Sequence, residues 1–211
     1  MPEANSLVQD AATIPCAIGP VELTGRQVKL VPLSPEHRAD LAAAVMDGEL
    51  WRLWYTSVPE PGEMGAEIER RLRLLASGSM VPFTVLDQPA GHVVGMTTYM
   101  NIDASNRRLE IGSTWYARAV QRTGLNTEAK LLLLTHAFET LECIAVEFRT
   151  HFLNQPSRRA IERLGARLDG VLRCHQKAKD GTMRDTCVYS IVSSEWPAVR
   201  SHLAWQLEKA G

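Results

Sequence analysis

Residues 121–130, with the sequence QRTGLNTEAK, combine residue types that could bind an anion. They follow the apolar stretch EIGSTWYARAV and precede the run LLLLTHAF, which is typical of a buried helix. A helix that begins near Asn126 or Thr127 presents unpaired backbone N–H groups and the positive end of its dipole. Gly124 would let a ligand approach the backbone closely, and Arg122 adds a positive charge. The alternative is an ordinary helix start after a glycine-containing loop.

The glycine spacing in this segment does not match the common nucleotide-binding motifs. It is neither G-x-x-x-x-G-K-[ST] nor G-x-G-x-x-G, so ATP and NAD are not the predicted ligands. The six histidines are scattered without ligand spacing, and the four cysteines contain no C-x-x-C pair, so no metal site is predicted. His151 and His175 could approach a substrate. Cysteines without a disulfide framework favour reduced thiols and hence a cytoplasmic location.

Three aromatic residues in the first half of the chain are candidates for substrate binding. Trp51, Trp54 and Tyr55 occur at i, i+3 and i+4, a spacing that would place them on one face of a helical turn. They could clamp an apolar or aromatic amine, or they could equally belong to the core. Acidic residues between positions 60 and 67 would suit a polyamine instead.

The composition predicts one globular domain. The chain has 211 residues, of which 45% are hydrophobic and 22% are charged, with a formal net charge of −1. This length suffices for one substantial core, and we predict an N-terminal arm over residues 1–20 and a single domain over residues 21–211. Nucleic acid is not the expected partner, because the charge balance offers no clustered basic surface. A membrane is not expected either, because no stretch reaches the roughly 18 apolar residues of a span.

The first half of the chain predicts several strands and two helices. We expect strands over 27–33, 80–86, 91–103 and 107–117, and helices over 34–47 and 63–78. Ser34 should cap the first helix, with Pro35 at its first position. The last three of these strands should form an antiparallel meander, because their connections are short.

The second half of the chain predicts a strand-helix-strand unit and a hairpin. We expect helices over 127–141, 156–166 and 193–209, and strands over 143–151, 167–177 and 184–192. The strands on either side of the 127–141 helix should be parallel, so the sheet is mixed. Asp180 and Gly181 predict the turn of the final hairpin. The last helix should bury one apolar side, formed by Trp196, Val199, Leu203 and Leu207.

Three short motifs lie between residues 109 and 165. The first is LEIG at 109–112, and the second is formed by Gln121, Gly124 and Asn126. The third, N-x-x-S-x-x-A-I-x-x-L-G, begins at Asn154 and ends at Gly165. Together they resemble the GNAT acyl-CoA-dependent N-acetyltransferases, in particular the Rim-type branch of ribosomal-protein N-terminal acetyltransferases. That family has Gln/Arg-x-x-Gly-x-Gly/Ala before its third helix, and asparagine replaces the last residue here.

The resemblance implies a GNAT fold of the α+β (mixed α/β) class, with a twisted sheet of six to seven strands and four to five helices. The fourth and fifth strands, at 107–117 and 143–151, would be parallel but splay apart around pantetheine. A β-bulge in the fourth strand would supply backbone N–H groups to the oxyanion. Acetyl-CoA would be the cosubstrate, without a metal. The residues expected to contact coenzyme A are Trp115, Tyr116, Ala117, Gln121, Arg122, Thr123, Gly124, Leu125, Asn126, Thr127, Asn154, Ser157 and Arg159.

The resemblance also implies catalytic roles for two side chains. Many relatives use a tyrosine, at the position of Leu164, to protonate the leaving thiolate, whereas the Rim-type branch places a serine in that role, here Ser157. Ser157 could instead only satisfy backbone groups in the first turn of a helix. Glu110 would accept the proton of the amine if its side chain faces the acceptor, or it could be a structural carboxylate within the sheet.

We therefore expect an acetyl-CoA-dependent N-acetyltransferase. Its acceptor would be a primary amine of a small molecule or the N-terminus of a protein or peptide. The alternatives are a transferase that uses a different acyl-CoA and a non-catalytic module that binds coenzyme A. A homodimer could form through the apolar final helix and the hairpin around Asp180.

Overall fold

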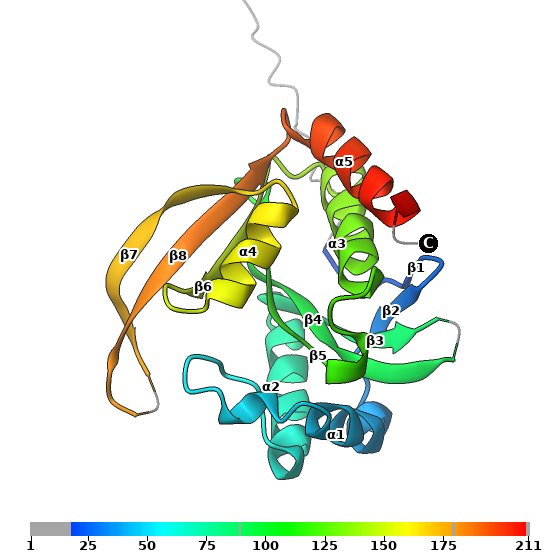
Figure 1. Cartoon of the computed structure of the whole chain (residues 1–211), viewed down its shortest axis with the longest axis vertical. Helices are drawn as coiled ribbons and strands as arrows, with labels where there is room; N and C mark the ends of the chain where they lie inside the picture. Colours follow the sequence, from blue (N-terminus) through cyan, green and yellow to red (C-terminus); the bar gives the residue numbers. More distant parts are fainter. Residues whose placement is uncertain (1–17, 89, 179, 210–211) are drawn as a thin grey trace, which may run out of the picture.

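The computed structural model describes residues 18–88, 90–178 and 180–209, which form one mixed β-sheet covered by helices (Figure 1). The strands run across the sheet in the order β1-β2-β3-β4-β5-β6-β8-β7. Neighbouring strands are antiparallel except β5 and β6, which are parallel. The strand bounds are β1 (Leu23–Thr24), β2 (Val28–Pro32), β3 (Met80–Asp87), β4 (His92–Asp103), β5 (Arg108–Tyr116), β6 (Ala145–His151), β7 (Arg167–Lys177) and β8 (Met183–Val192).

Five α-helices of the described chain cover the two faces of the sheet. Side chains of the first two helices share a core with Met96 and Trp115 on one face. The other three helices pack with Val146 and Tyr189 on the opposite face. The helix bounds are α1 (Arg38–Met46), α2 (Met64–Ala76), α3 (Leu125–Thr135), α4 (Gln155–Arg163) and α5 (Trp196–Lys209).

The predicted elements are all present, and the sheet has one strand more than the six to seven expected. The additional strand, β1, has only two residues and is too short to show a period-2 pattern. Ser34 caps the first turn as predicted, because its Oγ accepts the Glu36 N–H at 3.4 Å. Residues 1–17 of the predicted N-terminal arm lie outside the described residues, and Ile18 packs against the main core.

The predicted 127–141 helix differs from the observed one at both ends. α3 begins at Leu125 and ends at Thr135, and a π-helical turn continues it over His136–Thr140. The Tyr99 hydroxyl donates to the Leu133 carbonyl oxygen at 2.6 Å. A side chain that inserts into the carbonyl ladder of a helix is a usual cause of such irregular turns, and here it is a residue of the sheet.

The apolar side predicted for the last helix is buried, as expected. α5 packs against α3, and its buried residues are Trp196, Val199, Leu203 and Leu207. This side of α5 is therefore buried within the chain. The homodimer hypothesis had placed the apolar final helix at the dimer surface, but these four residues are not available to a second copy. The homodimer therefore stays a hypothesis that depends on the hairpin around Asp180.

The parallel pair β5–β6 separates after three residue pairs. The pairs are Arg108 with Ala145, Leu109 with Val146, and Glu110 with Glu147. β5 continues to Tyr116 and β6 to His151 without further pairing in the described sheet, which confirms the predicted splay. One edge of β5, from residue 111 onward, is consequently not hydrogen-bonded to a neighbouring strand.

Candidate active site

The N-terminus of α3 presents backbone N–H groups, as the sequence predicted. The first i to i+4 bond of the helix joins the Glu128 N–H to the Gly124 carbonyl oxygen at 2.9 Å. The Leu125 N–H donates to Thr123 Oγ1 at 3.2 Å. The N–H groups of Asn126 and Thr127 precede the helical ladder and point out of the helix end, where they can bind an anion.

A cavity of about 580 Å³ lies at this helix end. Arg122, from the loop, and Arg163, from the last turn of α4, both line it. Two guanidinium groups beside a helix N-terminus suit a ligand with several phosphate oxygens, such as a diphosphate. The other lining residues are Gln27, Thr123, Gly124, Thr127, Gln206 and Leu207.

The cavity contains residues that sequence reasoning did not identify. Gln27 comes from the turn between β1 and β2, and Gln206 comes from α5. Arg163 lies one turn beyond Arg159, which was predicted to contact the cofactor and is an exposed residue of α4. The one available sign was the helical spacing of four residues between these two arginines.

Gly124 lines the cavity and also leaves space for a neighbouring side chain. A Cβ atom at this position would lie 2.7 Å from Gln27 Oε1, so the glycine makes room for the Gln27 side chain. The turn that carries Gln27 is fixed to α3 by the Glu128 carboxylate. This carboxylate accepts the backbone N–H groups of Arg26 at 2.9 Å, Gln27 at 2.6 Å and Val28 at 3.0 Å. Glu128 thus fixes one wall of the cavity to the first turn of the helix.

The predicted contacts at the end of β5 are partly used within the protein. The Ala117 N–H donates to the Val94 carbonyl oxygen at 2.8 Å, so it points toward β4 and not toward the free edge. Gln121 Nε2 donates to the Tyr116 carbonyl oxygen at 2.9 Å. The side chains of Trp115 and Leu125 are buried in the core. Because the side chains of residues 115–117 are all buried, any contact of theirs with coenzyme A would be made by backbone atoms.

β5 contains the bulge that the resemblance implied. Thr98 pairs with Gly112 and Met96 pairs with Trp115, so Ser113 and Thr114 together face Thr97. Ser113 has a φ of 48°, in the left-handed region that non-glycine residues seldom adopt. Such a bulge turns backbone groups out of the regular ladder at the free edge of the strand.

Glu110 lies where the two parallel strands separate, and its carboxylate makes the contacts within the sheet that the structural alternative predicted. Its side chain is 5% exposed and is hydrogen-bonded within the sheet, since Oε2 accepts Asn101 Nδ2 at 2.7 Å. Arg149 Nε is 3.5 Å from the same oxygen. Burial raises the pKa of Glu110, and these two partners only partly oppose that effect. A carboxylate with a raised pKa is a suitable acceptor for the proton of an attacking amine.

Gly112 leaves space for this carboxylate. A Cβ atom at position 112 would lie 2.7 Å from Glu110 Oε1 and 2.8 Å from Met100 Sδ. The glycine of the LEIG motif therefore allows the Glu110 side chain to lie along its own strand.

The first turn of α4 holds Asn154 and Ser157 together. Asn154 Oδ1 accepts the backbone N–H of Ser157 at 3.2 Å, so Asn154 is the N-cap of the helix. Ser157 is half-buried. Because the cap involves only its backbone N–H, the Ser157 hydroxyl can still donate a hydrogen bond to a ligand. Leu164, where many relatives have tyrosine, is 2% exposed and packs in the core. Arg158 is held by Tyr189, whose hydroxyl accepts its Nε at 2.9 Å.

The three aromatic residues predicted on one helical face do not share a face. Trp51 lies in a 3-10 turn (Leu50–Arg52) and packs against the core beneath α1 and α2. The chain leaves the helical conformation at residue 53, so the i, i+3, i+4 geometry is lost. Trp54 and Tyr55 instead contact His151 at the end of β6, with ring centroids 5.1 Å and 6.5 Å from it.

His151 is not arranged as a proton acceptor. Its Nδ1 accepts the Leu153 N–H at 3.0 Å, and burial lowers the pKa of the ring. The neutral ring then carries its proton on Nε2 and can only donate from that atom. Among the groups near the strand separation, Glu110 is therefore the better candidate for the base.

No group of three or more histidine, cysteine or acidic side chains is placed to hold a metal ion within residues 18–88, 90–178 and 180–209. Over the same residues, no helix is both long enough and apolar enough to span a membrane.

Comparisons with known proteins identify the family and the fold. A family model described as an acetyltransferase (GNAT) domain matches residues 27–167. Over 111 residues the chain is 35% identical to a Bacillus subtilis (strain 168) protein named putative ribosomal N-acetyltransferase YdaF. This match covers 50% of the chain and 57% of the relative, so it spans little more than half of that relative's length.

Solved structures resemble the chain over most of its length. A GCN5-related N-acetyltransferase from Brucella melitensis has a TM-score of 0.81 and 32% identity, covering 92% of this chain and 89% of that one. Mycobacterium smegmatis RimJ in complex with CoA-disulfide has a TM-score of 0.73 and 22% identity, covering 89% and 93%. At 22% identity, the similarity to RimJ shows only that the two proteins share a fold.

Proposed function

The chain belongs to the GNAT acetyltransferase family, and on this premise we propose that it transfers an acetyl group from acetyl-CoA to a primary amine. The observation that carries the proposal is the position of the cavity at the N-terminus of α3. α3 is the next α-helix after β5, and the edge of β5 beyond Glu110 is not paired with β6. A diphosphate held in the cavity would direct the attached pantetheine along that edge.

Each step of the transfer has a candidate group. The amine nitrogen attacks the thioester carbon, and Glu110 accepts the proton that the amine loses. Backbone N–H groups at the β5 bulge stabilise the oxyanion. The carbon–sulfur bond then breaks, and the Ser157 hydroxyl donates a proton to the departing thiolate. The supporting observations are the raised pKa of Glu110, the bulge at Ser113 and the position of Ser157 in the first turn of α4.

We further propose that the acceptor is the N-terminal amine of a protein, as in the Rim-type branch. The support is the identity to YdaF, whose name describes a ribosomal N-acetyltransferase. Trp54 is 54% exposed and lies beside His151, where it could contact the first residues of a bound peptide. A cytoplasmic location and a homodimer are secondary hypotheses, of which the first is consistent with the free thiols of Cys143, Cys174 and Cys187.

Calorimetry and a thiol-release assay test these proposals separately. Coenzyme A should bind, and Arg163→Met should weaken binding about tenfold because one guanidinium leaves the cavity. Arg73→Met, on the exposed side of α2, is the matched control and should change nothing. Thiol release from acetyl-CoA should appear with peptides that have free N-termini, and less with small amines.

The outcomes distinguish the alternatives. Lack of affinity for coenzyme A would overturn the whole proposal. Binding without turnover on any amine or peptide would favour a non-catalytic coenzyme A module. Turnover with a longer acyl-CoA but not with acetyl-CoA would identify a different acyl donor.

A further inference from the structure

Two buried cations contact the β5 bulge from opposite faces of the sheet. Arg71, from α2, is 2% exposed, and Lys130, from α3, is 6% exposed. Neither residue belongs to the set predicted from the sequence, and the proposed chemistry does not use either of them. Buried cations are rare unless a specific interaction retains them, so their convergence on one irregular strand segment needs a physical reason.

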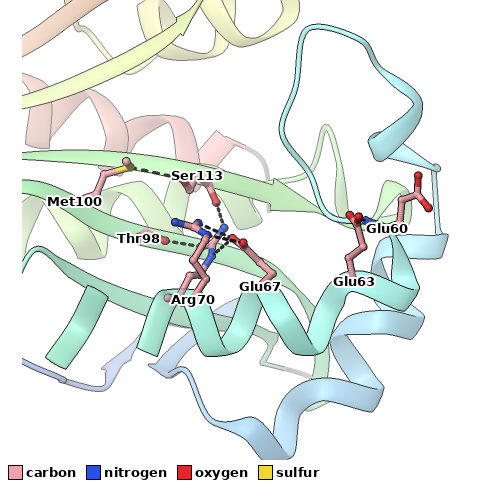
Figure 2. A network of polar contacts seen from close by, with 8 residues as sticks. Glu60, Glu63, Glu67, Arg70, Thr98, Met100 and Ser113 are labelled. Atoms are coloured by element: carbon pink, nitrogen blue, oxygen red, sulfur yellow. Dashed lines mark hydrogen bonds and ion pairs between the residues drawn. The ribbon is translucent and has the colours of Figure 1, made fainter. Parts of the chain in front are cut away.

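Arg71 joins the bulge to the neighbouring strand on the α2 side. Its Nη1 donates to Thr98 Oγ1 at 2.6 Å, and its Nη2 donates to the Ser113 carbonyl oxygen at 3.3 Å. Its Nε donates to Glu67 Oε1 at 2.7 Å, which balances the charge. Figure 2 shows Glu67 on the helix facing Thr98 and Ser113 on the sheet. Ser113 is the residue with positive φ, so Arg71 holds the most strained peptide of the bulge.

Lys130 makes the corresponding contacts on the α3 side. Its Nζ donates to Thr114 Oγ1 at 3.0 Å and to Thr97 Oγ1 at 3.3 Å. These two hydroxyls lie 2.8 Å apart and join β4 to β5. Both hydrogen bonds of the ammonium group therefore go to the strand segment that contains the bulge and to the residue directly opposite it.

The electrostatic environment of Lys130 explains how it is tolerated there. Burial lowers the pKa of Lys130 to about 7, so its charge is only partly present near neutral pH. Either protonation state can still donate to the two threonine hydroxyls.

The position of the bulge explains why it requires support on both faces. Beyond Glu110, β5 is bonded to β4 on one side and is not paired with β6 on the other. A bulge also interrupts the ladder to β4, because Thr97 faces two residues. Without additional contacts, the segment that should direct N–H groups at the oxyanion would be the most weakly held part of the sheet.

We propose that Arg71 and Lys130 are positioning residues that fix the β5 bulge between them, so that its free edge holds the thioester carbonyl in a reactive geometry. This inference rests on the proposed acetyl transfer. Displacement of oxyanion donors by about 1 Å lowers catalytic rates by roughly 10²-fold, so loss of either cation should act on kcat. The cavity that holds the diphosphate contains neither residue and should be unaffected.

The test uses Arg71→Met and Lys130→Met in the full chain. Both variants should fold, because Glu67 keeps Arg70 as a partner at 2.8 Å and the Thr97 and Thr114 hydroxyls keep each other. We expect kcat to fall at least fivefold, with the KM for acetyl-CoA and the Kd for coenzyme A within twofold of the parent chain. Hydrogen–deuterium exchange should accelerate in the peptide covering residues 111–117.

Matched variants separate positioning from a general loss of stability. Arg70→Met removes the exposed partner of the same Glu67, and Lys29→Met removes a lysine paired with Glu22 at 2.8 Å. Both should keep the parent kcat. Thr98→Val removes the hydroxyl to which Arg71 donates, so its kcat should fall as in Arg71→Met. Thr98→Ser retains the hydroxyl and should keep the kcat of the parent chain.

Each outcome decides the proposal. If kcat falls less than fivefold in either methionine variant, the positioning role of that residue is wrong, and a parallel rise in the Kd for coenzyme A would overturn the proposal for both. If the parent chain itself neither binds coenzyme A nor releases thiol, the proposed function fails. The exchange rate at residues 111–117 in the variants would still show whether the two cations hold the bulge.

Discussion

Glu110 and Glu147 face each other in the last parallel pair of β5 and β6, and their pKa values move in opposite directions. For Glu110, burial is the largest effect and raises the pKa. Burial also acts to raise the pKa of Glu147, but hydrogen bonds from Arg149 at 2.8 Å and Arg108 at 2.6 Å hold it below its usual value. The opposite pKa directions support the proposal that Glu110 is the base, whereas Glu147 is held in ion pairs with Arg149 and Arg108.

Replacement of Glu110 by glutamine should remove the general base. We expect kcat to fall by roughly 10²-fold or more, because proton transfer by a positioned side chain contributes about that much. The base must be deprotonated, so kcat of the parent chain should rise with pH through the raised pKa of Glu110. This rising limb should be absent in Glu110→Gln and present in the control Glu142→Gln, an exposed residue.

The same pKa direction predicts the effect of Glu110→Gln on stability. Because the pKa of Glu110 is higher in the folded chain than in the unfolded one, the folded state binds more protons between the two values. Stability from this group is present below the unfolded pKa and is lost as pH rises through the folded pKa. Glu110→Gln should therefore not lower Tm at pH 7, and a large drop would mean that the rate loss reflects unfolding.

Ser157→Ala should lower kcat without affecting folding of α4. The helix cap uses the backbone N–H of Ser157, which alanine keeps, so Tm and the Kd for coenzyme A should stay close to the parent values. Loss of general acid catalysis should reduce kcat about 100-fold when measured by thiol release. A rate within a factor of about two of the parent chain would exclude Ser157 as the proton donor.

Glu128→Gln should destabilise the chain and weaken coenzyme A binding together. The buried carboxylate accepts three backbone N–H groups, and an amide would place its own N–H groups against some of them. We expect a loss of about 2 kcal/mol in the free energy of unfolding, measured by thermal denaturation. Glu69→Gln, on an exposed part of α2, is the control, and an equal effect in both would refute the role of Glu128.

Trp54→Ala should weaken binding of the acceptor peptide without changing binding of acetyl-CoA. If Trp54 contacts a bound peptide, its loss should raise the KM for the peptide by about tenfold and leave the KM for acetyl-CoA unchanged. Trp205→Ala provides a matched control, because Trp205 is 50% exposed on α5 and Trp54 is 54% exposed. Equal peptide KM values for the two variants would remove Trp54 from the acceptor site.

Much of the fold could be predicted from the sequence because its elements carry clear periodic patterns. The strand and helix order and the buried side of α5 followed from the spacing of apolar residues, and the parallel pair followed from the strand-helix-strand connection. The boundary errors arise where tertiary contacts decide, as at α3, where the Tyr99 hydroxyl bonds the Leu133 carbonyl oxygen. The separation of 34 residues between these two positions leaves no local sign of the contact.

The sequence could predict only those residues of the candidate site that lie together in one short segment. The loop before α3 and the first turn of this helix form such a segment, and Arg122, Thr123, Gly124 and Thr127 from it do line the cavity. Gln27 and Gln206 reach the cavity from elements far away in the chain, so no local motif contains them. Arg71 was the nearest to being detectable, since it lies three residues after Ile68, on a helix side that otherwise faces the core.

The cavity takes one wall from the turn before β2 and another from α5, through Gln206 and Leu207. During translation, its first and last lining residues are synthesised about 180 positions apart. A nascent chain therefore completes this cavity only after α5 has left the ribosomal tunnel and folded back onto α3. Chains that terminate before α5 would lack the wall that Gln206 and Leu207 form.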